Sequence, residues 1–182
     1  MEEALRQAVG AASARADVAA AVRAVYDAVG AEIYQRKPAC TASGRCCRFE
    51  EYGHRLYVTT LELAAFLRGR ADAEARPDAP GSAAHPPTSL SSLILPPSPL
   101  PSDGCPFQVD KLCSVHAIRP FGCRMFFCDP TSTDWQNDAY ERFHAELKSL
   151  HERLGVPYFY VEWRAALRAL GWAATRPAGA GA

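Results

Sequence analysis

The sequence has no excess of charge of either sign, since twenty Lys and Arg residues balance twenty Asp and Glu residues in 182. A chain without net charge has no long-range attraction for nucleic acid or for an anionic membrane. We therefore expect neither kind of partner. The length predicts one domain, large enough to enclose a hydrophobic core of its own.

Several familiar signals are also missing. The first residues lack the basic and then apolar layout of a signal peptide, and they lack the long apolar run of a membrane span. No phosphate-binding loop, HExxH, GxSxG or dinucleotide-binding fingerprint is present. These absences favour a cytoplasmic protein, in which thiols stay reduced, and an odd number of cysteines also argues against a disulfide framework.

Cysteine, by contrast, is abundant and is concentrated in two clusters about sixty residues apart. Thiolates are soft, strong ligands for zinc, copper(I) and iron–sulfur clusters. We therefore predict that the two clusters converge on one metal centre. The predicted ligands are all seven cysteines: Cys40, Cys46, Cys47, Cys105, Cys113, Cys123 and Cys128.

The spacing of the cysteines favours an iron–sulfur cluster, with zinc as the alternative. The paired CxxC knuckles of zinc ribbons are absent, and seven cysteines exceed the four that one zinc ion uses. Cys47 is preferred to Cys46 as a ligand, because adjacent side chains usually point apart. The ligands expected first are Cys47, Cys113, Cys123 and Cys128, followed by Cys40.

The residues around the cysteines support this interpretation. Pro120 and Gly122 are expected to impose a turn that aims several thiolates inward. Positive neighbours lower thiol pKa values and offset the charge of a thiolate centre. The arginines close to a cysteine are Arg45, Arg48, Arg119 and Arg124.

The order of these residues resembles a known family. The first cluster contains Cys40, Ser43, Cys46 and Cys47, and it is followed by CPF, a cysteine, RPFGCR and a last cysteine. This order is similar to that of the YkgJ-type cysteine-cluster family, whose first motif is CxxCxxCC. The resemblance covers roughly residues 40 to 130 outside an insertion. It implies a zinc- or iron-chelating domain, or one containing an iron–sulfur cluster, with the seven cysteines as ligands.

Two positions depart from that family. Ser43 occupies the second cysteine position, so a centre built from eight cysteines is excluded. His116 stands where an aromatic residue is common, which makes it a candidate nitrogen ligand. Some members are similar to flagellin lysine methylases, but this chain shows no glycine-rich loop for a methyl donor.

The predicted fold class is α+β and mostly helical, in one small domain with a short β-hairpin and cysteine-rich loops around the metal. A capping box of Thr59 and Glu62 predicts the start of a helix that continues to about Leu67. Three parts are expected: an N-terminal helical segment (1–38), a cysteine-cluster domain (39–175) and a disordered tail (176–182). Residues 2–35 are expected to form either one long helix or two shorter helices divided at Gly30. The other expected elements are a strand over 55–58, a hairpin of 105–108 and 112–115, a helical turn over 116–119, a helix over 137–154, an extended segment over 158–161 and a short helix containing Trp163.

Residues 71–101 hold eight of the fourteen prolines, with Ala and Ser filling much of the remainder. This composition predicts a flexible insertion that metal binding does not require. On the last long helix, His144 and His151 lie two turns apart, too far to share a metal, and are expected on a solvated face with Lys148.

The function favoured by these features is a cytoplasmic metal-binding protein with an iron–sulfur cluster or zinc, acting in electron transfer or as a subunit of a redox system with an unidentified partner. A non-redox zinc module that mediates a protein interaction is the first alternative. A cluster-dependent, methylase-like enzyme is the second.

Overall fold

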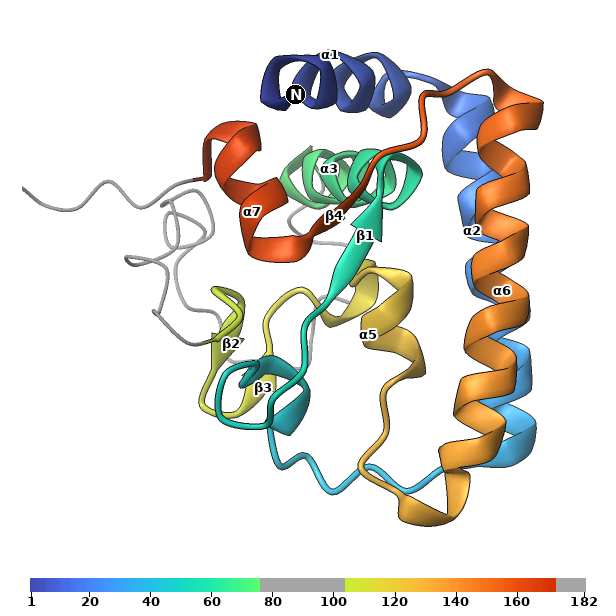
Figure 1. Cartoon of the computed structure of the whole chain (residues 1–182), viewed down its shortest axis with the longest axis vertical. Coiled ribbons are helices and arrows are strands. Elements are labelled where there is room, and N and C mark those ends of the chain that lie inside the picture. The colour runs from blue at the N-terminus through green and yellow to red at the C-terminus, as the bar shows by residue number, and fades with distance from the viewer. Residues whose placement is uncertain (76–103, 173–182) are drawn as a thin grey trace, which may run out of the picture.

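The computed structural model describes residues 1–75 and 104–172, and this part of the chain is mostly helical with two small antiparallel sheets (Figure 1). The long helices are α1 (Glu2–Ser13), α2 (Ala16–Arg36), α3 (Thr60–Ala75) and α6 (Thr133–Leu154); the short ones are α5 (Phe121–Met125) and α7 (Trp163–Leu167). One sheet pairs β1 (Tyr57–Thr59) with β4 (Tyr160–Glu162), and the other pairs β2 (Gln108–Val109) with β3 (Leu112–Cys113). Single helical turns are η1 (Arg45–Cys47), η2 (His116–Ile118), η3 (Pro130–Ser132) and η4 (Arg168–Trp172). The predicted α+β class is confirmed for these residues.

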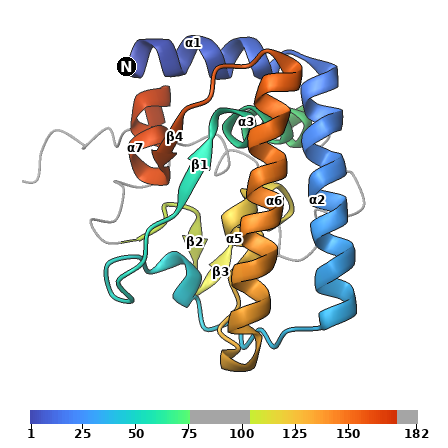
Figure 2. The ribbon, with the colours of Figure 1, turned by 45° about the vertical axis from the view of Figure 1, so that its right-hand side comes forward.

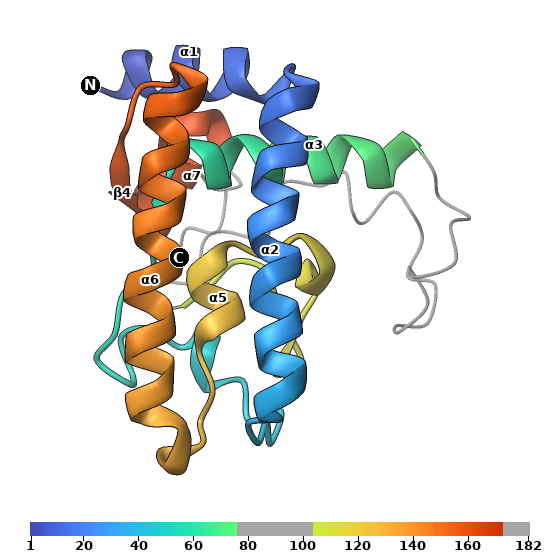
Figure 3. The same ribbon diagram turned by 90° about the vertical axis from the view of Figure 1, so that its right-hand side faces the viewer.

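Two long helices form one side of the molecule. Figure 3 shows α2 and α6 side by side, with α5 packed against both at mid-length. Their contact is apolar because valines recur along one face of α2 and meet a matching stripe on α6. The residues of these two stripes are Val18, Val22, Val25, Val29, Phe143, Leu147 and Leu150.

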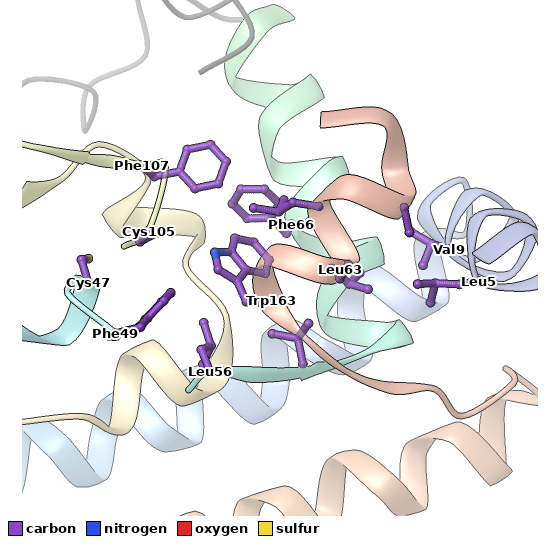
Figure 4. Close-up of a cluster of buried hydrophobic side chains, with 14 residues drawn as sticks. Leu5, Val9, Cys47, Phe49, Leu56, Leu63, Phe66, Cys105, Phe107 and Trp163 are labelled. Atoms are coloured by element: carbon purple, nitrogen blue, oxygen red, sulfur yellow. The ribbon is translucent and has the colours of Figure 1, made fainter. Parts of the chain in front are cut away.

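A second buried cluster lies where α1 crosses α3, and it extends to the cysteine-bearing segments (Figure 4). Phe66 and Trp163 are at its centre, with ring centroids 5.1 Å apart in an edge-to-face arrangement. Cys47 and Cys105 belong to the same cluster, with 6% and 7% of their surfaces exposed. Two of the thiols are therefore part of the hydrophobic core.

The N-terminal helical segment divides at a different place from the one expected. Arg15 has an extended backbone conformation (φ −87°, ψ 124°), and it separates α1 from α2, whereas Gly30 lies inside α2. The predicted alternative in which the helical segment divides at Gly30 is therefore wrong. Tertiary packing explains the break, because Val9 of α1 packs on α3 while Val18 of α2 faces the other core cluster.

Helix α3 begins as predicted and ends later. The Thr59 backbone N–H donates to Glu62 Oε2 at 2.8 Å, and the Glu62 N–H donates to Thr59 Oγ1 at 3.4 Å, which confirms the capping box. The helix continues to Ala75, past the expected end at Leu67, and an Arg68–Asp72 ion pair supports the added turns. Residues 76–101 of the predicted insertion and the predicted tail at 176–182 lie outside the described residues.

The two small sheets agree with the predicted extended segments to within a few residues. The hairpin of β2 and β3 turns at Asp110 and Lys111, whose φ angles of 49° and 68° fit a two-residue type I′ turn. Strand β1 pairs with the distant β4, and Val58 lies opposite Val161. Among the described helices, none combines the length and the apolar character needed to cross a bilayer.

Candidate metal centre

The two cysteine-bearing segments meet through main-chain contacts. The Cys105 N–H donates to the Cys47 carbonyl at 2.7 Å, and Gln108 Nε2 donates to the Gly44 carbonyl at 2.8 Å. Gly44 has a φ of +73°, and a side chain there would collide with Gln108 and Lys111. The sequence therefore brings the loop before Cys46 directly against the hairpin that follows Cys105.

The sulfurs of the adjacent cysteines lie close together. Cys46 Sγ and Cys47 Sγ are 4.0 Å apart, so the expectation that these side chains point apart is wrong. The reason is local: both residues are in the helical turn η1, in which Cys47 N–H bonds to the Gly44 carbonyl at 3.1 Å. Consecutive side chains in such a turn diverge less than they do in a strand.

Three thiols touch and two more lie within electrostatic range. Cys47 hydrogen-bonds to both Cys46 and Cys105, and the charges of Cys46 and Cys105 act on Cys113 and Cys123. We call these five residues the inner thiol group: Cys46, Cys47, Cys105, Cys113 and Cys123. They come from η1, the hairpin and α5.

The inner thiols differ in their affinity for a proton. The hydrogen bond from Cys47 lowers the pKa of Cys46 to about 6, and it also lowers the pKa of Cys105. The same bonds to Cys105 and Cys46 raise the pKa of Cys47, and burial raises the pKa values of Cys113 and Cys123. Cys47 therefore keeps its proton and shares it with two neighbours that tend to ionise.

Two buried N–H groups suit a negatively charged centre. The Arg119 guanidinium lowers the pKa values of Cys46, Cys113 and Cys123, and its buried Nε has no hydrogen-bond partner among the described residues. The Trp163 indole N–H is also buried without a nitrogen or oxygen partner and lowers the pKa of Cys105. Figure 4 shows the Trp163 nitrogen on the side of the ring toward Cys105. The sequence places Trp163 in a short helix, and no residue near it in the sequence signals this second role.

The other three arginines singled out in the sequence have different contacts. Arg48 Nη1 pairs with the Glu51 carboxylate at 2.9 Å, and the Arg45 guanidinium lies 4.3 Å from the centre of the Tyr52 ring. Arg124 donates to main-chain carbonyls of the segment before α5. Arg119 is thus the arginine whose charge lowers the pKa values of three inner thiols, while Arg124 also interacts with the charge of Cys123.

The remaining cysteines lie apart from the inner thiol group. Cys128 Sγ is 3.6 Å from Ser43 Oγ, the residue at the second cysteine position of the resembled family. Cys40 is exposed. No contact among the described residues joins either thiol to the inner group, although the sequence places Cys128 among the first ligands. Their role as ligands remains a prediction.

His116 also makes no contact with a thiol in the described part of the chain. Burial lowers the pKa of its imidazole, and the neighbouring charges of Arg119 and Arg124 lower it further. The ring is therefore neutral at pH 7, the state in which histidine binds metals. Nothing in its position singles it out as a ligand.

Glu62 positions the helix that carries Cys123. It is 2% exposed, and its Oε1 accepts a hydrogen bond of 3.0 Å from the Phe121 N–H at the start of α5. The expected turn at Gly122 is wrong: Pro120 precedes α5 and Gly122 lies within it. Gly122 is needed for close packing, since a Cβ there would lie 2.6 Å from Leu56 Cδ1.

Within residues 1–75 and 104–172, no three or more Cys, His, Asp or Glu side chains already have the arrangement of a metal site. The donor chemistry nevertheless fits a soft metal, because five thiols gather beside the buried N–H groups of Arg119 and Trp163, which have no nitrogen or oxygen partner in the described part of the chain. Comparison with protein-family models, curated proteins and solved structures finds no match to the chain. The resemblance to the YkgJ-type family therefore stays a prediction.

Proposed function

We propose that this protein binds an iron–sulfur cluster, or alternatively zinc, through thiolates of the inner thiol group. The observation that carries the proposal is the meeting of two distant cysteine segments, with Cys47 hydrogen-bonded to both Cys46 and Cys105 at the edge of a hydrophobic core. Unpaired thiols are common in cores, but five of them close to an arginine with a buried Nε are not needed for packing. Metal ligation would explain why the five thiols and Arg119 lie together.

Iron–sulfur is favoured over zinc because the paired CxxC knuckles of zinc ribbons are absent from both cysteine segments. Such a centre would serve electron transfer or a redox system, with the cytoplasm as the proposed location. Buried N–H groups near cluster sulfurs raise the reduction potential, and this is the effect we assign to Arg119 and Trp163.

A structural zinc site is the second candidate, and one observation favours it. Cys47 and Cys105 pack with Phe49, Phe107 and Trp163, so a metal there would join the core that holds the hairpin to α3 and α7. Zinc in such a position stabilises the fold directly. The surface around it would then serve a protein partner.

Anaerobic purification of the full chain, followed by iron, zinc and sulfide analysis, tests the proposal. We expect stoichiometric metal, with visible absorbance and acid-labile sulfide if a cluster is present and with neither if zinc is. Protein that folds with less than about a tenth of an equivalent of both metals under conditions of ample supply would refute the proposal.

Variants test which thiols are ligands. Cys47→Ser and Cys105→Ser should remove most of the metal, because each deletes a donor from the touching set. Cys40→Ser is the matched control, since Cys40 is exposed and has no contact with the inner group. Cys128→Ser should retain more metal than Cys123→Ser; the reverse order would show that the inner group is wrongly composed.

A further inference from the structure

A cavity of about 240 Å³ lies beside the inner thiol group, and most of its lining residues are not cysteines. Its walls come from four parts of the chain: the loop after η1, the β1–β4 sheet, α5 with the residues that follow, and the first half of α6, which lie around one region in Figure 2. Cys46 and Cys123 contribute to one wall. The volume suits a single small molecule.

The aromatic side chains of the cavity are exposed and yet held in place. The Tyr57 and Tyr160 rings stack with centroids 5.3 Å apart, and the Tyr160 hydroxyl is 3.1 Å from that of Tyr140. His54 and Phe126 stack at 5.0 Å. Tyr57, Tyr160 and Phe126 nevertheless remain 38 to 40% exposed. Ordered aromatic faces open to solvent are suited to a flat ring, which would bury them at little cost in side-chain entropy.

The polar side chains of the cavity mostly offer hydrogen-bond donors. Arg55 lines it without a hydrogen bond or a close ion pair to any described residue; its charge lowers the pKa of the nearby Glu50 carboxyl, but that carboxylate is paired with Arg164 at 2.6 Å. Gln136 uses its Oε1 to accept from the Phe127 N–H at 2.8 Å, which leaves its amide N–H groups available. No Asp or Glu is among the lining residues. Donors and a guanidinium without carboxylates favour an anion.

We infer that this cavity binds a small planar organic anion, of the class of aromatic carboxylates, with its ring against the Tyr57–Tyr160 and His54–Phe126 stacks and its carboxylate at Arg55. The inference goes beyond the metal proposal and does not depend on it, because none of these contacts requires a metal. In either form of the protein, the bound molecule would lie next to Cys46 and Cys123.

Calorimetric and ¹⁵N NMR titrations of the full chain with four probes test the inference. Benzoate carries both the ring and the charge, benzamide the ring alone, acetate the charge alone, and benzylamine the ring with the opposite charge. We expect benzoate to bind best. Arg55→Gln should weaken benzoate about tenfold, as for a hydrogen bond to a charged group, and change benzamide little. Tyr160→Leu should weaken both.

Matched controls are Arg153→Gln and Tyr34→Leu, which remove an arginine and a 77% exposed tyrosine outside the cavity. Neither should affect binding. Because Arg55 is exposed, its variant should fold, and this keeps the test decisive if Tyr160→Leu does not. The inference is overturned if benzylamine or acetate binds as well as benzoate, if benzoate does not bind, or if Arg55→Gln and Arg153→Gln behave alike. Titrating metal-free and metal-loaded protein separately keeps this outcome distinct from the outcome of the metal analysis.

Discussion

Replacing the buried carboxylate Glu62 by glutamine should change how the stability of the protein depends on pH. Burial raises the pKa of Glu62 to about 7 from 4.5, against the opposing hydrogen bonds from Thr59 and Phe121. The folded state therefore takes up a proton at a pH where the unfolded chain has already lost it. This contribution to stability is complete below about pH 4.5 and is lost as the pH rises through about 7.

The size of the effect follows from the two pKa values. Each pH unit between them corresponds to about 1.4 kcal/mol, which gives about 3 kcal/mol across the whole window. A glutamine at position 62 cannot titrate. The free energy of unfolding of the natural chain minus that of Glu62→Gln should therefore fall by about 3 kcal/mol between pH 4.5 and pH 8.

Urea unfolding of metal-free, reduced protein, followed by tryptophan fluorescence at several pH values, measures this difference. Glu32→Gln is the matched control, and its effect on the pH dependence of stability should have the opposite sign. Hydrogen bonds from Arg142 and Trp135 lower the pKa of Glu32 against its partial burial, so its contribution is lost as the pH falls. If Glu62→Gln and the natural chain keep parallel pH profiles, the pKa of Glu62 is the same in the folded and unfolded states and the burial argument is refuted.

Four further outcomes are expected. Gly122→Ala should cost up to about 1 kcal/mol in urea unfolding because the Leu56 side chain must shift away from its Cβ, and this cost should become smaller when Leu56→Ala is already present; strictly additive losses of the two variants would contradict the overlap. Arg119→Gln should lower metal occupancy while Arg119→Lys largely preserves it, as judged by metal analysis, and equal occupancy in both would remove Arg119 from the site. Ser43→Ala should leave metal content unchanged, since a neutral hydroxyl is a poor ligand for soft metals; a loss would make Ser43 part of the centre. A short Gly/Ser linker in place of residues 76–99 should leave metal content and Tm near their original values, since each twofold change in loop length costs only about 0.6 kcal/mol, and emptying of the site would contradict this.

The elements with strong local signals could be predicted from the sequence. The capping box of Thr59 and Glu62, the hairpin around Asp110 and Lys111 and the long helix ending at Gly155 all depend on residues within one or two turns of each other. The break at Arg15 could not be predicted, because neither glycine nor proline marks it. It exists because α1 and α2 pack on different parts of the core.

Side-chain environments on a correctly predicted helix were harder to infer. His151 was expected on a solvated face, yet it is 3% exposed and its Nδ1 lies 3.1 Å from the Val156 carbonyl. The chain turns back at Gly155 and covers that face of α6, and Tyr158 packs edge-on against the His151 ring. A helical pattern identifies an apolar stripe, but it does not show which polar residue a following segment will bury.

The cysteines show the same limit. Their number and clustering indicate a shared site, but the sequence does not divide them into five that gather and two that lie apart. That division depends on contacts between distant segments: Gly44 against the hairpin, Glu62 with the Phe121 N–H, and Ser43 beside Cys128. Each of these contacts joins residues more than forty positions apart, beyond the reach of a local pattern.

The way in which the two segments are joined also determines what a cysteine variant can reveal. The Cys105 N–H bonds to the Cys47 carbonyl, and Gln108 bonds to the Gly44 carbonyl, so the principal links between the segments use the main chain or a glutamine rather than a thiol. Replacing a thiol by a serine hydroxyl keeps these bonds and removes little volume. The metal-free variants should therefore keep the segments together, and loss of metal from Cys47→Ser or Cys105→Ser would report on ligation rather than on unfolding.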